Sequence, residues 1–571
     1  MLRHRKALAP EGAERGPDPG TKPCDTSTPA SAAVETVLFC ALLMVRLCSA
    51  MWNTISDCDE TYNFWEPTHY LLHNFGFQTW ECSPQFALRS YAYIGLHAAV
   101  GKLAVTSGAG KVATFYAIRI VLGVVCTCCE VAFSRAAAHV FGRETGMFCL
   151  TFMLTCSGMF HASTAYLPAS FCMYGVMLVY WAWLRGQNRL AVFLGVATVM
   201  TGNWPFVGAI FVPLALETVS KQGLARAMLW GVQAGVLFGL PTAAVDSWFY
   251  QRLVVPSWNL VAYNAFGGGG GSGAELYGSE PWSFYFKNVF LNLNVVGALA
   301  LVAPMALFLP PIHARSEATT RASRSSAVLC PLQVAIYLSP LYLWFAVMTA
   351  QPHKEERFLF PVYPLFCLAA ATTVTKLRRL AHTEPWWCTR TLRFVRFIVW
   401  AAMSSAAILG VARSASTLRG YSAPIQVFSR VAELQLDKPA QLCLGQEWYR
   451  FPTSFFVPSS PRLNVSFVRA GFTGHLPAHF LSDGGTSRDG GPFNDMNRDE
   501  PSRYVHIDSC DFIVDLDLEQ HWTSNSTWSI LARYPFLNGA ESHPLFRAFY
   551  VPFTSQSLSF AEYLLLERKS E

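Results

Sequence analysis

Long apolar runs separated by short polar segments dominate this chain. Runs such as 32–51 and 328–349 carry few or no charges, and each is long enough to cross a hydrocarbon core of about 30 Å. Asn203-Trp204-Pro205 interrupts one run, which we therefore expect as two half-helices. The pattern predicts a polytopic α-helical membrane protein with about eleven transmembrane helices. We expect the spans near 34–52, 90–108, 112–134, 145–161, 168–185, 189–218, 227–249, 284–310, 327–350, 357–376 and 394–413.

Composition agrees with a membrane location. Of the 571 residues, 52% are hydrophobic and only 14% are charged, whereas a soluble domain carries roughly 25% charged residues. The net charge of +6 arises from basic residues in the loops between apolar runs, as is typical of cytoplasmic loops. Because no zinc-finger spacing or basic arm is present, we expect no nucleic-acid partner. The clustered basic residues are Arg315, Arg321, Arg324, Lys376, Arg378, Arg379, Arg390, Arg393 and Arg396.

The order of the spans predicts three parts. Residues 1–30 are rich in Pro, Gly and charge and predict a disordered cytosolic tail. Residues 31–413 form the transmembrane domain, whose first luminal loop is 53–89. Residues 414–571 contain turn residues and short alternating runs, and we expect a small luminal α/β domain there. Counting spans puts 351–356 in the lumen as well. The N-glycosylation sequons at Asn464 and Asn525 agree with this count, since only a luminal domain could use them.

Cysteine and glycine patterns add little chemistry. Most of the sixteen cysteines lie in apolar spans and are expected to pack as small side chains. Four lie outside the cytosol, and sequence leaves all three disulfide pairings open; these four are Cys58, Cys82, Cys443 and Cys510. We interpret the glycine-rich insertion 267–273 as flexible chain and not as a phosphate cradle. No His/Asp ligand cluster exists beyond the acidic pair of the first loop, so we expect no metal.

Candidate chemistry begins in the first luminal loop. Asp57, Asp59, Glu60 and Glu66 stand among several aromatic residues just after a span. Aromatic faces stack on sugar rings, and a carboxylate accepts a hydroxyl proton, more readily when partial burial raises its pKa. The alternative is an interfacial aromatic belt that includes incidental acids.

A second candidate is the segment His353-Lys354-Glu355-Glu356-Arg357-Phe358 between two later spans. On a helix, His353 and Arg357 would stand at i and i+4 with Lys354 towards the same side. Three such donors could hold a lipid phosphate, with the arginine fork binding two oxygens. Alternatively, Glu355 and Glu356 neutralise the basic residues in an interfacial charge cluster.

Together, an acidic and a basic loop in one compartment favour group transfer from a lipid phosphate sugar. Phosphate is a good leaving group, so its displacement needs one base and a cation, whereas glycoside hydrolysis uses two carboxylates. One base favours transfer with inversion. A transporter would also carry intramembrane charges, but we find no internal repeat of the kind transporters often show. A structural subunit of a glycosylation complex is a third alternative.

These two segments resemble a known family. The first reads DCDETYNFWEPTHY from Asp57, followed by GFQTWE and Ser83-Pro84, and the second reads HKEERFLFPVYPL from His353. Both resemble the eukaryotic dolichol-phosphate-mannose-dependent α-1,2-mannosyltransferases of N-glycan precursor assembly. The resemblance implies a C-type glycosyltransferase fold in the endoplasmic reticulum membrane with a luminal active site. It implies dolichyl β-D-mannosyl phosphate as donor, with no further cofactor, and dolichyl-diphosphate-linked six- and eight-mannose oligosaccharides as acceptors.

The resemblance also suggests roles for individual residues. We expect Asp59 to be the general base. Glu60, Trp65, Glu66 and His69 are then the residues expected at the acceptor. The donor phosphate is expected at His353, Lys354 and Arg357. Relatives that add mannose to glycosylphosphatidylinositol anchors, or the α-1,6 residue of the N-glycan, share the architecture and are the alternative function.

Overall fold

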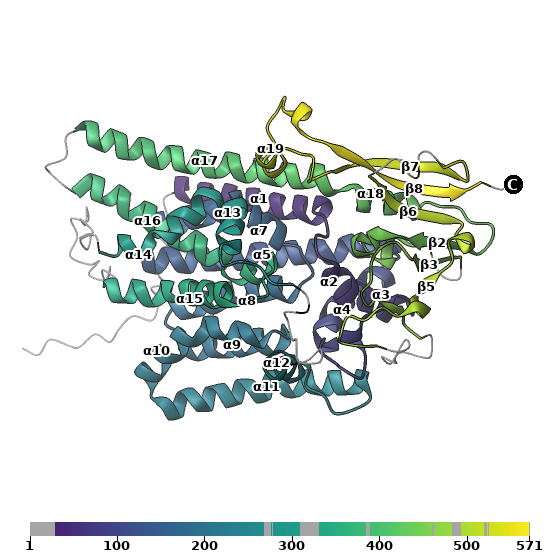
Figure 1. Cartoon of the computed structure of the whole chain (residues 1–571). Coiled ribbons are helices and arrows are strands. Elements are labelled where there is room, and N and C mark those ends of the chain that lie inside the picture. Colours follow the sequence, from purple (N-terminus) through teal and green to yellow (C-terminus); the bar gives the residue numbers. More distant parts are fainter. Residues whose placement is uncertain are drawn as a thin grey trace, which may run out of the picture.

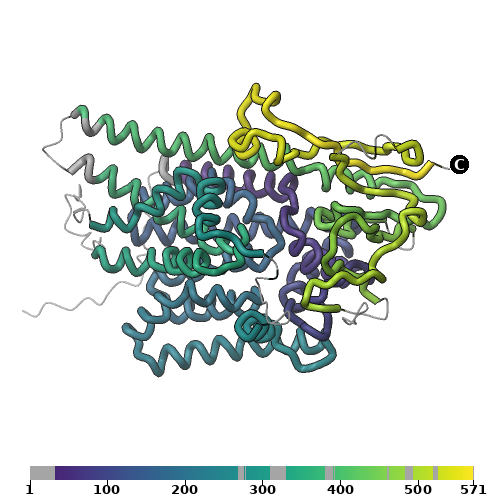
Figure 2. The backbone as a smooth tube through the Cα atoms, in the orientation of Figure 1, coloured from purple at the N-terminus to yellow at the C-terminus, as the bar shows by residue number. Residues whose placement is uncertain are grey.

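The computed structural model describes residues 29–267, 276, 278–308, 330–383, 389–458, 462–481, 493–518, 522 and 525–569. Figures 1 and 2 show a body of long helices that run side by side, with a smaller sheet domain at one end. The expected cytosolic tail (up to Thr28), most of the glycine-rich insertion and the basic residues at 315–324 lie outside the described residues.

Seven of the described helices are long and apolar enough to span a membrane. Two shorter apolar helices, α8 (Pro168–Leu184) and α9 (Asn188–Thr201), pack among them. The seven spans involve α1 (Pro29–Trp52), α5 (Lys111–Phe141), α11 (Leu224–Tyr250), α13 and α14 (Phe284–Leu301 and Ala303–Ala306), α15 (Pro331–Ala350), η6 and α16 (Glu356–Val362 and Tyr363–Thr383), and α17 (Thr389–Tyr421).

Within the described residues each predicted span coincides with helical structure, but several are interrupted. The run at 189–218 divides as expected: α9 ends at Thr201, and Asn203 adopts a left-handed φ of 50°. Pro205 then begins η3, because proline fixes φ and suits the first turn of a helix. The run at 145–161 is also broken, at Cys156. The remaining helices of the body are α4 (Tyr91–Thr106), α6 (Arg143–Thr155), α7 (Ser157–Ala162), η3 (Pro205–Phe211), α10 (Val212–Gln222) and α12 (Pro256–Phe266).

A buried ion pair ties three helices of the body together. Arg46 of α1 contacts Glu130 of α5, with 2.6 Å between Nη2 and Oε1, and both side chains are fully buried. The same Nη2 donates to the Met153 carbonyl oxygen of α6. Ionisable side chains within a membrane are costly unless paired and turned inwards. This pair therefore fixes helix positions away from the sheet domain.

The loop after α1 is compactly folded. Asp57 caps α2 (Cys58–Glu60), which continues without a break into η1 (Thr61–Trp65) and α3 (Glu66–His73). Asn74 ends α3 in the left-handed conformation. Gly76 follows at a φ of 152°, where an added Cβ would lie 3.0 Å from the Glu66 carbonyl oxygen, so only glycine fits. The loop closes with β1 (Phe77–Gln78) and η2 (Trp80–Cys82).

A six-stranded sheet forms the domain that follows α17 and α18. Its order is β5-β3-β2-β6-β8-β7; β2 pairs in parallel with β3 and β6, and β8 pairs antiparallel with β6 and β7. The expected α/β domain is thus a mixed sheet, and α17 continues to Tyr421, beyond residue 413. The elements are α18 (Ala423–Val431), β2 (Ala440–Leu444), η7 (Gln446–Arg450), η8 (Ser454–Phe456), β3 (Leu463–Val468), β4 (Ala478–His479), η9 (Pro501–Arg503), β5 (Tyr504–Val505), η10 (Ile507–Ser509), β6 (Phe512–Asp517), β7 (Trp528–Leu537), α19 (Pro544–Ala548), η11 (Ser555–Ser557) and β8 (Phe560–Arg568).

Both faces of the central strands of this sheet are buried. Alternate residues of a strand point to opposite faces, so Leu442 and Leu444 join the main core while Cys443 joins a second, smaller cluster. In that second cluster Cys443 forms a disulfide with Cys510. This settles the pairing that sequence left open, since Cys58 and Cys82 keep their thiols.

The first loop and the sheet domain lie on the same side of the helical body. Strand β1 pairs antiparallel with β4, matching Phe77 with His479. Tyr62 donates a hydrogen bond of 2.7 Å to the Trp448 carbonyl oxygen. The two segments therefore share one compartment, as the predicted topology requires.

Candidate active site

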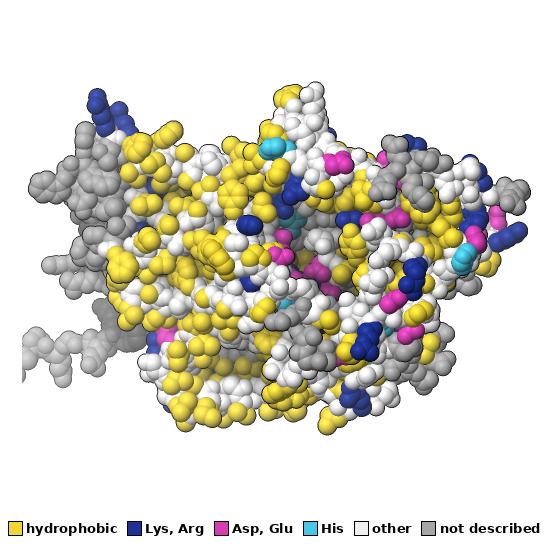
Figure 3. Space-filling view, viewed as in Figure 1, with side chains coloured by type: hydrophobic (Ala, Val, Ile, Leu, Met, Phe, Trp, Pro, Cys, Tyr) yellow, Lys and Arg dark blue, Asp and Glu magenta, His cyan; other side chains and the backbone are white. Residues whose placement is uncertain are grey.

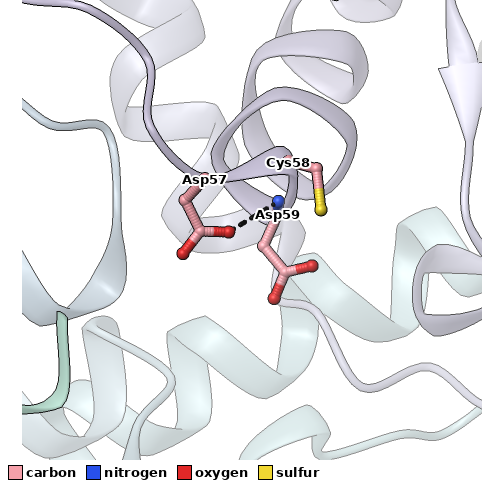
Figure 4. A group of neighbouring side chains, drawn as sticks. All are labelled: Asp57, Cys58 and Asp59. Atoms are coloured by element: carbon pink, nitrogen blue, oxygen red, sulfur yellow. Dashed lines mark hydrogen bonds between the residues drawn. The ribbon is translucent and has the colours of Figure 1, made fainter. Parts of the chain in front are cut away.

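The first turn after α1 presents two carboxylates. Asp57 Oδ1 accepts a hydrogen bond of 2.9 Å from the backbone N–H of Asp59, which fixes the start of α2. Figure 4 shows this hydrogen bond, with the two carboxylates next to each other on the same side of the turn. Their side chains remain 24% and 32% exposed, although the helix that follows is buried. Asp57 and Asp59 therefore stand at the edge of the packed loop.

Arg357 joins the two sequence-predicted segments. Its Nη2 lies 2.6 Å from Asp59 Oδ2, its Nη1 lies 2.9 Å from Asp57 Oδ2, and its Nε contacts Glu355. Arg357 lies in the first turn of η6, which leads into α16. Residues nearly three hundred positions apart thus form one cluster at the membrane boundary.

Arg89 places a second cation beside Asp59. Its Nη2 lies 3.8 Å from Asp59 Oδ2 and 2.8 Å from Glu81 Oε1. Glu81 also accepts a hydrogen bond from Asn63 Nδ2. Glu81 therefore holds Arg89 at the end of the loop, facing Asp59.

These charges shift the pKa values of the two carboxylates in opposite directions. Burial raises the pKa of Asp57 to about 7, with Arg357 opposing the rise and Asp59 adding to it. Burial acts on Asp59 too, but the positive charges of Arg357 and Arg89 outweigh it and hold the pKa of Asp59 below its usual range. Near neutral pH, Asp59 is a carboxylate able to accept a proton, whereas Asp57 is partly protonated.

Asp57, Cys58 and Asp59 are also spaced like a metal site, with candidate ligand atoms within 4.8 Å of one another. However, Arg357 already contacts both carboxylates. Burial also raises the pKa of the Cys58 thiol well above its usual value, which disfavours the thiolate that a metal would bind. A cation would have to displace the guanidinium from this cluster.

The other residues expected at the acceptor are buried scaffold. Glu60 Oε1 accepts hydrogen bonds of 3.0 Å from Trp65 Nε1 and from the backbone N–H of Tyr166. Trp65 is fully buried between the rings of Phe115 and Tyr166. These contacts leave no surface for a sugar, because the side chains fill the interior beneath the two aspartates.

Glu66 and His69 are equally enclosed. Glu66 has no exposed surface and accepts hydrogen bonds from Phe77 N, Thr453 Oγ1, Ser454 N and Ser454 Oγ at 2.6–2.9 Å. His69 donates from Nδ1 to the Phe75 carbonyl oxygen at 2.7 Å. Instead of contacting an acceptor, Glu66 fastens the first loop to the sheet domain.

The segment before Arg357 is not helical, so the expected i and i+4 arrangement is wrong. His353 lies outside η6; its Nε2 contacts Glu355 Oε1 at 2.8 Å, and this bond raises the pKa of His353. Lys354 is buried and donates from Nζ to the carbonyl oxygens of Glu280 and Gln351. Pro352 accepts a hydrogen bond from the Glu280 N–H within a bent segment that precedes η6.

Sequence reasoning named Asp57 and Glu355 without giving either a role at the site, and it missed Arg89. Asp57, Arg89 and Glu355 complete the cluster around Asp59 and Arg357. Arg413 of α17 lies near both Glu356 and His161 of α7. A charged or histidine residue inside an apolar span is unusual enough to be a signal in itself, and it could have identified Arg413 and His161.

Figure 3 shows a hollow between the helical body and the sheet domain, where acidic, basic and histidine side chains gather on a largely apolar surface. The site residues come from the first loop, from the segment 353–357 and from the ends of spans. The fold and the site together define a membrane-embedded transferase.

Comparison with known proteins agrees with this class. The chain belongs to the Alg9-like mannosyltransferase family, whose model matches residues 37–458. It is 37% identical to Alpha-1,2-mannosyltransferase ALG9 of Mus musculus, over 97% of this chain and 92% of that protein. It is 38% identical to the Homo sapiens protein of the same name, over 93% and 88%.

A solved structure confirms the expected C-type glycosyltransferase fold. ArnT from Cupriavidus metallidurans in the apo state aligns over 88% of this chain and 96% of its own, with a TM-score of 0.51 and 13% sequence identity. The chain is therefore a membrane-embedded glycosyltransferase of the mannosyltransferase family.

Proposed function

We propose that the protein transfers mannose from dolichyl phosphate mannose to dolichyl-diphosphate-linked oligomannose in the lumen of the endoplasmic reticulum. The linkage formed is α-1,2, and the acceptors are the six- and eight-mannose intermediates of N-glycan precursor assembly. The observation that carries this proposal is the pairing of the partly exposed Asp59 with Arg357 at 2.6 Å. The names of the α-1,2-mannosyltransferase relatives support the choice of linkage.

In the reaction, Asp59 accepts the proton of the acceptor 2-hydroxyl. The freed oxygen attacks C1 of the donor mannose, and the bond from C1 to the phosphate oxygen breaks, leaving dolichyl phosphate. Attack opposite the leaving group converts a β donor into an α product. Asp59 then releases its proton to solvent. The low pKa of Asp59 keeps the carboxylate ionised before each cycle.

Arg357 is the proposed partner of the donor phosphate, with His353 beside it. A guanidinium has five N–H donors, and the carboxylates of Asp57, Asp59 and Glu355 face three of its nitrogens. The remaining N–H groups can meet phosphate oxygens as negative charge develops there. Lys354 acts at a distance, because its two carbonyl contacts hold the bend that precedes Arg357.

The luminal orientation rests on the sheet domain. A disulfide between Cys443 and Cys510 suits an oxidising compartment. Asn464 is exposed on β3, where a glycan would not disturb the core, and Asn525 is partly exposed. If the domain is luminal, both sequons can be used. We expect endoglycosidase treatment to shift the gel mobility of the wild-type protein, because its sequons carry glycans in the lumen. The Asn464→Gln, Asn525→Gln double variant should show no such shift.

The function is tested with purified protein, dolichyl phosphate mannose and defined lipid-linked acceptors. We expect one mannose added to each of the six- and eight-mannose acceptors, with α-1,2 linkages shown by linkage-specific mannosidase digestion. Cells that lack the protein should accumulate the six-mannose intermediate. Accumulation of a glycosylphosphatidylinositol precursor, or of the intermediate awaiting an α-1,6 residue, would instead assign the protein to one of those branches.

A further inference from the structure

Glu356 faces away from the aspartate cluster and lines a second group of polar side chains. Its neighbours Glu355 and Arg357 contact each other and the Asp57–Asp59 turn. Glu356 Oε1 instead accepts a hydrogen bond of 2.9 Å from Asn292 Nδ2 of α13. Helix α7 packs against η6, α13 and α17 at this level, so four segments meet around Glu356.

Three atoms of this group are buried without a hydrogen-bond partner among the described residues. They are His161 Nε2 of α7, Asn292 Oδ1 of α13 and Arg413 Nε of α17. Buried polar atoms normally form hydrogen bonds, and a buried donor or acceptor without a partner costs free energy. The positive charge of Arg413 acts on both Glu356 and His161, so these atoms belong to one small region.

The hydrogen bonds around His161 decide what its free nitrogen can do. Asn53 Nδ2 donates a hydrogen bond of 3.1 Å to the His161 carbonyl oxygen, and a carbonyl oxygen can only accept. Asn53 Oδ1 therefore faces His161 Nδ1, at 2.7 Å, and the ring must donate there. In neutral His161 the opposite nitrogen, Nε2, is then a hydrogen-bond acceptor.

The remaining groups follow the same reasoning. Asn292 Nδ2 donates to Glu356, so Asn292 Oδ1 is an acceptor, and the Glu356 carboxylate is a third acceptor. Arg413 Nη1 donates a hydrogen bond of 3.2 Å to the Ala548 carbonyl oxygen. The Nε–H of Arg413 is the donor that remains without a partner among the described residues. An anion is a poor fit for this group, because it would face three hydrogen-bond acceptors and only one cation, Arg413. A ring bearing several hydroxyls, each able to donate and accept, matches the whole set.

We propose that His161, Asn292, Glu356 and Arg413 form a subsite for a mannosyl ring. This rests on the proposed function and extends it, because it gives the sugar its own site, separate from the phosphate partner Arg357. The peptide bond between Glu356 and Arg357 joins the two groups, since Arg357 contacts the Asp59 carboxylate and Glu356 contacts Asn292. The ring is either that of the lipid-borne donor or the terminal mannose of the acceptor.

The test compares Arg413→Lys and Asn292→Ala with wild-type protein, using purified enzyme and donors whose mannose lacks single hydroxyls. Arg413→Lys keeps the charge but removes the Nε–H donor. Wild-type protein should show a KM raised on the order of tenfold for at least one deoxy donor. The variants should show a similar rise with the full donor and lose the discrimination against that deoxy analogue.

Arg419→Lys is the matched control, because Arg419 is exposed on the same helix and stacks over Tyr550 at 5.3 Å. If Arg413→Lys and Asn292→Ala raise only the KM for the donor, the ring is that of the donor. If they raise only the KM for the acceptor, and wild-type protein discriminates against deoxy acceptors and not deoxy donors, the ring is that of the acceptor. The subsite is refuted if wild-type protein transfers mannose and Arg413→Lys, folded normally, keeps both KM values and all discrimination. If wild-type protein transfers no mannose, the proposed function fails instead.

Discussion

Two neighbouring stretches of the first loop have similar residues and different surroundings. Residues 57–59 and 60–69 are both acidic, and they are continuous along one helical segment. Asp57 and Asp59 remain partly exposed and pair with arginine side chains. Glu60 and Glu66 are buried and bind backbone N–H groups and hydroxyls.

The partners explain the difference in role. A carboxylate held by backbone donors is fixed, because releasing it would leave buried N–H groups unsatisfied. A carboxylate paired with a partly exposed arginine can exchange that contact for substrate at smaller cost. We therefore assign the proposed chemistry to Asp57 and Asp59, and the buried carboxylates Glu60 and Glu66 to the scaffold that holds them in place.

The largest effect expected is on catalysis, from Asp59→Asn. This change keeps the size of the side chain and removes the proton acceptor, so kcat should fall about a thousandfold. The melting temperature and the amount of protein in the membrane should stay at wild-type values. Mannose transfer in microsomes, normalised to protein abundance, measures the effect.

Asp508→Asn, on the exposed surface of the sheet domain, serves as the control and should be fully active. Normal turnover by Asp59→Asn would remove Asp59 from the mechanism. Asp57 would then be the base to test next, since its pKa of about 7 also suits proton transfer.

The sequence predicted the helical body and the meeting of its two polar segments. The apolar runs predicted the helices, and the count of spans together with the family resemblance of the two motifs predicted that the segments share one compartment. The sequence could not predict which acids of the first loop are exposed. Glu66 is buried only because Thr453 and Ser454, nearly four hundred residues later, fold over it. The bend at Pro352 also escaped prediction, since it depends on the Glu280 backbone.

The second effect concerns stability, from Glu66→Ala. Four donors lose their acceptor, and unsatisfied buried groups cost about 1–3 kcal/mol each. We expect a lower melting temperature and less folded protein, with kcat per folded molecule close to wild type. Fluorescence-detected size-exclusion chromatography after heating measures the folded fraction.

Glu66→Gln provides the matched comparison, since its amide oxygen can still accept from part of the set. It should lie between wild type and Glu66→Ala in stability. A stable Glu66→Ala protein with a raised acceptor KM would show instead that Glu66 contacts the acceptor, and the contrast between the two stretches would disappear.

The third effect is a pH dependence of a few-fold. As pH rises through about 7, Asp57 loses its proton, and the new negative charge competes for Arg357. A nearby like charge makes Asp59 more basic, so kcat/KM should rise about three- to tenfold between pH 6 and 8. In Asp57→Asn the side chain resembles the protonated form at every pH. Its profile should be flat, at the level of wild type at pH 6. A wild-type profile that is equally flat would show that Asp57 does not tune Asp59.

The smallest effect is expected from chelation. Asp57, Cys58 and Asp59 could bind a divalent cation by spacing, but both carboxylates are paired with Arg357, which supplies the positive charge that a metal would bring. We therefore expect EDTA to change kcat by less than about twofold, within the range of screening effects. Arg357→Gln should lower activity in the same assay, and added Mg²⁺ or Mn²⁺ should not restore it. Loss of wild-type activity in EDTA, with recovery on adding either cation, would mean that the aspartates exchange the guanidinium for a metal during turnover.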